Sequence, residues 1–209
     1  MENHVHKPVL VPVWDWFVRV FHWSTVLGFA SAWLTGTYGA NEIHILLGYG
    51  ITLLLLARLV WGLIGTPYAR FSALRISPAE VMRYIRSLRS GSPLHYLGHN
   101  PLGGLMVCAL LLMLFALSVS GLVILGAIEF EGPLLAFTQM LDDNQAYAVH
   151  ELHEVLAWLA LLLVALHVAG AVSASIQHHE NLVLAMITGR KRLQPVQDST
   201  TTAPERSKQ

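Results

Sequence analysis

The chain has 209 residues, of which 54% are apolar and only 12% carry a charge. Soluble domains usually carry about 25% charged residues, so this composition predicts a protein that lies in a membrane. The 13 basic and 13 acidic residues cancel, which excludes a strongly basic nucleic-acid-binding protein. The single cysteine, Cys108, allows neither an internal disulfide nor a site built from several cysteines.

Four apolar stretches are each long enough to cross a bilayer core, which needs about 20 residues in a helix. They cover roughly residues 17–40, 43–65, 101–128 and 149–177. Because a spanning segment must satisfy its own backbone groups, and because these stretches lack strand-like alternation, we expect helices. The predicted fold class is all-α, an integral membrane bundle of four transmembrane helices in a single domain over residues 1–192. The tail at 193–209 is expected to be disordered.

The basic residues predict how the four spans are oriented. None of them lies within residues 38–57 or 90–189. With four spans, the segments that do carry them all fall on one side, and positive charge marks the cytoplasmic side. Both termini are therefore expected in the cytoplasm, together with the connection Thr66–Asn100, which is interpreted as a loop rich in Arg, Ser and Pro.

Ionisable residues inside a span are costly and by default mark a functional site. Spacing selects His153 and His167 within the fourth span: 14 residues at about 100° each bring both rings to one helix face, about 21 Å apart along the axis. His150 lies about 100° away from that face. His22 and His44 begin the first and second spans. The remaining histidines are expected in the N-terminal tail or at the membrane interface: His4, His6, His95, His99, His178 and His179.

The expected topology places these four histidines at two depths. His44 and His153 lie near the outer surface, whereas His22 and His167 lie deeper, near the cytoplasm. Two such pairs suit two planar groups that each need two axial ligands, and haem iron between two imidazoles is the natural occupant. Zinc fits less well because it needs a third or fourth ligand close by. The alternative is a haem-free membrane anchor or transporter whose histidines make interhelical hydrogen bonds.

Three neighbouring residues support the haem interpretation. Arg58 lies 14 residues after His44, hence on the same face at the deeper level, where a haem propionate would supply the anion that a buried guanidinium needs. Arg19, three residues before His22, is a second candidate for this role. For both arginines the alternative is a side chain that extends to the cytoplasmic surface. Gly48, one turn after His44, leaves room either for a porphyrin or for close helix packing.

Several motifs together resemble a known family. They are Val13-Trp14-Asp15, His22-Trp23, His44-x-x-x-Gly48, Arg58-x-x-Trp61-Gly62, His99-Asn100-Pro101-Leu102-Gly103 and Gly189-Arg190-Lys191-Arg192. Over roughly residues 10–192 the chain resembles the bacterial four-helix di-haem cytochromes b, which include cytochrome b561 and the b-type subunit of nickel–iron hydrogenases. The resemblance implies two non-covalent b haems whose axial ligands fall on His22, His44, His153 and His167.

The same resemblance implies a multi-pass protein of the bacterial inner membrane. It implies electron transfer between the quinone pool, as ubiquinone or menaquinone, and a redox partner such as a hydrogenase-like subunit or a c-type cytochrome. Such a chain acts as an electron-transfer subunit rather than as an independent catalyst. A second interpretation is a stand-alone cytochrome b561-type oxidoreductase that acts on a small oxidant or reductant such as superoxide.

Overall fold

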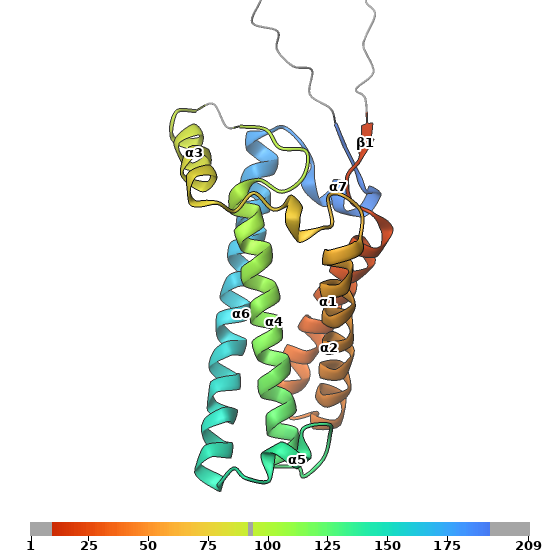
Figure 1. Cartoon of the computed structure of the whole chain (residues 1–209), viewed down its shortest axis with the longest axis vertical. Coiled ribbons are helices and arrows are strands. Elements are labelled where there is room, and N and C mark those ends of the chain that lie inside the picture. Colours follow the sequence, from red (N-terminus) through yellow and green to blue (C-terminus); the bar gives the residue numbers. More distant parts are fainter. Residues whose placement is uncertain (1–9, 92–93, 193–209) are drawn as a thin grey trace, which may run out of the picture.

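The computed structural model describes residues 10–91 and 94–192, in which four long helices run side by side (Figure 1). These helices are α1 (Trp16–Thr37), α2 (Asn41–Ile64), α4 (Pro101–Ala127) and α6 (Asp143–Gln177). Contacts join α1 to α2, α2 to α4, and α4 to α6. The pair formed by α1 and α2 therefore packs against the pair formed by α4 and α6 through α2 and α4. The expectations for His4, His6 and the tail at 193–209 lie outside the described residues.

Three of these helices, α2, α4 and α6, are long and apolar enough to cross a membrane. Many large apolar side chains of α2 and α6 stay exposed, whereas most of those on α4 are half-buried; exposed apolar side chains are usual for surfaces that meet lipid tails. The 22 residues of α1 span about 33 Å, but Arg19, His22 and several serines and threonines make this helix less apolar. The all-α membrane fold is confirmed, and the crossing of the membrane by α1 stays a prediction.

Side-chain caps explain where the long helices begin. The carboxylate of Asp15 accepts a hydrogen bond from Val18 N at 2.8 Å and starts α1. Asp142 and Gln145 form a capping box, in which each side chain bonds the other residue's backbone N–H. This box starts α6 well before the expected span at 149–177, so the helix extends beyond its apolar part.

The connection Thr66–Asn100 is not a loop throughout, and this expectation was wrong. It contains the short helix η1 (Phe71–Ala73) and the amphipathic helix α3 (Pro78–Arg89). Ser77 caps α3 by accepting from the backbone N–H of Glu80 at 3.3 Å, and Pro78 occupies the first turn. A serine followed by proline and then glutamate is a helix-start signal, which the arginine-rich composition of the connection obscured.

The two ends of the described chain meet at one end of the bundle. Strand β1 (Leu10–Pro12) pairs antiparallel with β2 (Arg190–Arg192), which follows the short helix α7 (Leu182–Thr188). Gly189, at φ +80°, turns the chain between α7 and β2, and its carbonyl accepts from Val13 N and Trp14 N at 2.8 and 3.0 Å. The opposite end of the bundle holds α5 (Leu135–Thr138).

Candidate functional site

One pair of histidines lies toward the end of the bundle that holds α5, and we call His44 and His153 the outer pair after their expected side of the membrane. Their ring centres are 6.2 Å apart, and the ring planes are at 83° to each other. His44 comes from the first turns of α2 and His153 from α6. His150, by contrast, has an exposed ring that lies 3.7 Å from the carboxylate of Glu154. The structure therefore brings His153, and not His150, opposite His44.

Hydrogen bonds fix the orientation of both outer rings. Nδ1 of His44 lies 2.9 Å from the carbonyl of Ala32 on α1, and because a carbonyl only accepts, Nδ1 carries the proton. Nδ1 of His153 lies 2.8 Å from Oγ of Ser120 on α4. Since the Ser120 hydroxyl donates to the Ala116 carbonyl at 2.8 Å, the imidazole donates to the serine. Both rings thus keep the lone pair of Nε2 free for a metal.

A cavity of about 500 Å³ surrounds the outer pair. All four long helices contribute to its walls, and its volume is within the range of sites that hold small molecules and cofactors. Besides the two histidines, its lining includes Phe29, Trp33, Gly48, Ile51, Leu114, Leu117, Gly121 and Trp158. The cavity is therefore largely apolar, and His150 and Glu154 reach its wall beside the two imidazoles that face each other.

Three glycines leave space around the outer pair. A Cβ at Gly36 would lie 3.1 Å from Nδ1 of His44, and one at Gly121 would lie 3.4 Å from Cε1 of His153. A Cβ at Gly48 would meet no neighbouring segment within 4 Å, although this glycine lines the cavity. Gly36 and Gly121 therefore make room for the rings themselves, whereas Gly48 faces space that a bound group can fill.

The inner pair, His22 of α1 and His167 of α6, lies nearer the end where the strands meet. The ring centres are 6.3 Å apart and the planes are at 54°. Trp23 packs edge-on against His22, with ring centres 5.1 Å apart. Nδ1 of His22 is buried and finds no hydrogen-bond partner among the residues that the structure describes. A buried, unpaired imidazole nitrogen usually indicates a missing ligand, ion or water.

The separation of the rings tests whether a haem fits. An imidazole binds a metal at about 2.0–2.1 Å, and its ring centre lies about 1.1 Å behind the nitrogen, so two rings on opposite sides of one ion are about 6.3 Å apart. The outer and inner pairs, at 6.2 and 6.3 Å, both fit this value. Within residues 10–91 and 94–192, no group of three or more His, Cys, Asp or Glu could hold a metal ion. The donor sets thus suit metals that need two protein ligands, as haem iron does.

Arg58 is buried near the C-terminal end of α2, with 6% of its surface exposed. Its Nη2 donates to the Ala69 carbonyl at 3.1 Å, and its guanidinium carbon lies 5.2 Å from the centre of the Phe71 ring. Nη1 is buried and has no hydrogen-bond partner among the described residues. The side chain therefore does not extend into solvent, and it keeps one charged N–H group free for an anion.

Asp15 connects the start of α1 to the end of α2. Its Oδ2 accepts from Nε1 of Trp61 at 3.0 Å and from the Thr66 hydroxyl at 2.6 Å. Burial raises the pKa of the Asp15 carboxyl, but the hydrogen bonds from Thr66, Val18 and Trp61 outweigh this effect and hold the pKa below its ordinary value of 3.8. Asp15 is therefore a carboxylate at neutral pH, and it fixes the entry to α1 against α2.

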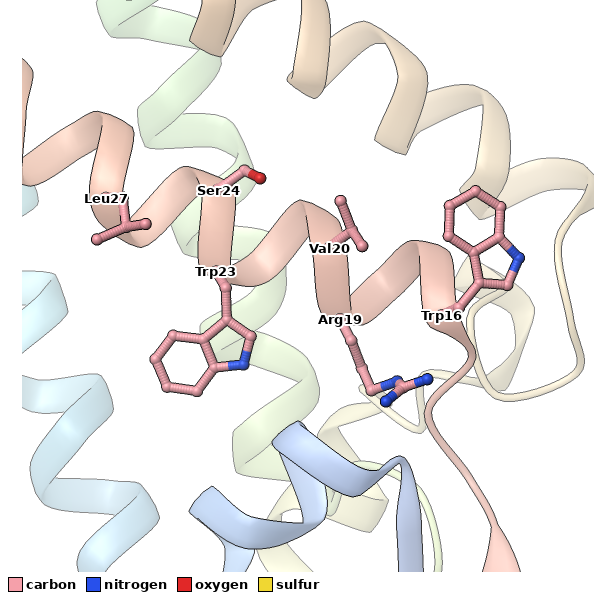
Figure 2. A pocket seen from close by; sticks show the side chains of 6 residues that line it. All are labelled: Trp16, Arg19, Val20, Trp23, Ser24 and Leu27. Atoms are coloured by element: carbon pink, nitrogen blue, oxygen red, sulfur yellow. The ribbon is translucent and has the colours of Figure 1, made fainter.

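Arg19 lies in a different environment from Arg58. It is positioned between Trp16 and Trp23 on α1, beside the C-terminal segment, and these residues line a shallow pocket (Figure 2). Its Nη1 donates to the carbonyl of Ile187 at 2.7 Å. This bond ties α1 to α7, and a role for Arg19 in cofactor binding stays a prediction.

The residues that support the outer rings carry little signal in the sequence. Ser120 and Gly36 stand in stretches where apolar and small residues alternate irregularly, and nothing in their spacing points to a histidine on another helix. A polar side chain within the long uncharged span of α4 was the available signal for Ser120, since such groups in membranes usually bond a neighbouring helix.

Comparison with known proteins gives a consistent result. Residues 13–189 match the family described as prokaryotic cytochrome b561. The probable Ni/Fe-hydrogenase B-type cytochrome subunit of Azotobacter vinelandii is 25% identical over 90% of this chain and 91% of its own length. The proteins of the same description from Rhizobium leguminosarum bv. viciae and Cupriavidus necator are 24% and 25% identical, over 90% and 82% of this chain and 91% and 83% of their own lengths. No solved structure matches the chain.

The family match covers the four long helices and both histidine pairs. The motifs that suggested the resemblance lie within the same range, apart from the last residues of the final one. The chain therefore belongs to the prokaryotic cytochrome b561 family of membrane cytochromes, which implies b-type haem as its cofactor.

Proposed function

We propose that the chain is a di-haem cytochrome b that carries electrons across the bacterial inner membrane. His44 and His153 would hold one haem, and His22 and His167 would hold the other. A bound haem supplies one-electron chemistry at its iron, and two imidazole ligands leave that iron no open coordination position. The observation that supports this proposal most directly is the presence of two histidine pairs whose ring separations both suit a single iron ion.

The protein then contributes to this function in three ways. Ser120 and the Ala32 carbonyl hold the proton on Nδ1 of each outer ring and so present Nε2 to the metal. The α6 helix keeps His153 and His167 about 21 Å apart along its axis, so that the two sites lie at different depths. The apolar lining of the cavity excludes water and lowers the local dielectric constant.

The partners of this electron transfer are proposed from the same evidence. Relatives named as hydrogenase B-type cytochrome subunits favour a hydrogenase-like subunit or a c-type cytochrome as the redox partner near the outer pair. The quinone pool, as ubiquinone or menaquinone, would exchange electrons near the inner pair. Basic residues accumulate at the end of the bundle that holds the inner pair, which supports a cytoplasmic position for this end.

Liposomes that contain the purified protein, a quinol analogue and a membrane-impermeant oxidant such as ferricyanide test this function. In protein whose outer end faces the oxidant, we expect quinol to reduce ferricyanide through the wild-type chain. His44→Ala should abolish this transfer, whereas His150→Ala, which changes an exposed ring on the same side, should leave it intact. Equal rates for wild type and His44→Ala would contradict the proposal.

A further inference from the structure

A buried cationic group at the inner end is only partly satisfied by the protein. Arg58 is almost fully enclosed, and its Nη1 lacks a partner among the described residues. Asp15 is the nearby carboxylate, but its two oxygens already accept from Val18 N, Trp61 and Thr66. A buried guanidinium with a free N–H costs free energy unless an anion completes its hydrogen bonds.

The loop contacts bring His99 to the same place. Ala69, which accepts from Arg58, follows Tyr68, and the Tyr68 ring packs so closely on Gly98 that a Cβ there would lie 3.2 Å from it. His99 comes next in the chain, with its ring centre 4.6 Å from that of Trp14. The contact of Tyr68 with Gly98 therefore joins the segment that accepts from Arg58 to the segment that carries His99.

The electrostatics of His99 agree with this placement. Removal from water is the main cause that lowers the pKa of His99 to about 4, and the positive charges of Arg58 and Lys191 and the imidazole of His167 contribute to the same shift. His99 is therefore within electrostatic reach of both Arg58 and a member of the inner pair. At neutral pH the ring is uncharged and has one N–H to donate.

The geometry points to a carboxylate-binding pocket in which Nη1 of Arg58 and the ring of His99 together hold a propionate of the inner haem. This inference rests on the proposed function, and it adds His99, which the sequence placed at the membrane interface, to the residues that bind the cofactor. Cationic and N–H donors that surround a propionate stabilise the reduced form of the adjacent iron, because they offset the negative charge beside it.

The test uses the purified, haem-loaded full chain and two variants, Arg58→Gln and His99→Asn. Potentiometric titration of the haem absorbance should show that each variant lowers the midpoint potential of the inner haem and leaves that of the outer haem unchanged. Arg75→Gln and His179→Asn, which change exposed side chains at the same end, should alter neither potential. Unchanged inner potentials in both test variants would overturn the inference.

A second measurement separates a propionate contact from a general structural effect. Full-length protein depleted of haem in detergent is reloaded either with haem or with haem dimethyl ester, in which both propionates are neutral. In wild type we expect the ester to bind the inner pair about tenfold more weakly than haem does. In Arg58→Gln and His99→Asn this difference should shrink, because the carboxylate has lost a partner.

The outcomes distinguish the two levels of the proposal. A wild-type chain without haem would reject the proposed function. A wild-type chain that binds two haems, with the same preference for haem over its ester in all variants, would reject only the carboxylate pocket. If Arg58→Gln fails to fold, His99→Asn carries the comparison alone.

Discussion

The outer and inner histidine pairs have nearly equal ring separations, 6.2 and 6.3 Å, but the protein supports them differently. Each outer ring donates a hydrogen bond from Nδ1, to Ala32 and to Ser120, and a cavity of about 500 Å³ lies around them. In the inner pair, Nδ1 of His22 is buried and lacks a partner among the described residues. The outer rings are thus oriented by protein groups alone.

This difference shows where each site obtains its stability. Groups that orient a ligand through its second nitrogen typically change metal affinity 10–100-fold, and only the outer pair has such groups on both rings. Near the inner pair, His99 is instead within electrostatic reach of both Arg58 and His167. Changes to helix residues should therefore affect the outer site through ring orientation, whereas the inner site should depend on charge.

The largest expected effect comes from removing a ligand at one level. His153→Ala should reduce the haem content from about two to about one per chain, because one imidazole no longer holds the outer iron. The pyridine haemochrome assay measures this content. His150→Ala, one turn away with an exposed ring, is the control and should keep both haems. Retention of both haems in His153→Ala would show that the pairs are not the ligands.

A bulky side chain in the cavity should act almost as strongly on the outer site. Gly48 lines the cavity, and a Cβ there would meet no neighbouring segment within 4 Å. In Gly48→Leu the added side chain would therefore occupy part of the cavity, so this variant should lose the outer haem and keep the inner one. Gly50→Leu is the matched control, since Gly50 is exposed on the same helix and also has no neighbour within 4 Å. Absorbance spectra and haem content compare the two variants; similar haem loss in both would contradict a cofactor in this cavity.

A smaller change is expected when the hydrogen bond to His153 is removed. Ser120→Ala should weaken binding at the outer pair about 10–100-fold, because Nδ1 of His153 loses its acceptor. Titration of haem-depleted protein with haem measures the affinity. Ser118→Ala changes a serine that lines the cavity without bonding either histidine and should bind as wild type does. An equal loss in both serine variants would remove the special role of Ser120.

The last effect concerns stability and pH at the inner end. Asp15→Asn replaces the oxygen that accepts from Trp61 and Thr66 with an amide nitrogen, and we expect a loss of about 1–3 kcal/mol of unfolding free energy. Because the folded pKa of Asp15 is depressed below 3.8, its contribution is present above that value and is lost as the pH falls through the folded pKa. Thermal unfolding in detergent across this pH range should show a gap between wild type and variant that closes in acid. A gap of constant size would contradict this assignment.

How much could be predicted from the sequence depends on the range of the interactions. Apolar stretches and the 14-residue spacing of His153 and His167 are local patterns. Helix geometry alone converts this spacing into a shared helix face and a separation along the helix axis. The supports of the outer rings are contacts between helices: Ala32 reaches His44 from α1, and Ser120 reaches His153 from α4. Which residues meet there depends on helix rotation and crossing, which a single sequence does not specify.

The inner end shows the same limit in its loops. Arg58 could be assigned a buried anion-binding role because it follows His44 on one helix face, and the structure places it in a buried position. His99 was expected at the membrane interface, because no helical register relates it to the histidine pairs. Its position depends on how the loop after α3 folds against Trp14 and Tyr68, a tertiary contact without a local signal.

The most direct test of the account is the haem content and ligation of the purified wild-type chain. The pyridine haemochrome assay should give about two b haems per chain, and electron paramagnetic resonance of the oxidised protein should show low-spin iron with two imidazole ligands at both sites. One haem per chain, or iron with an open position or a ligand other than histidine at either level, would contradict the assignment of the two histidine pairs.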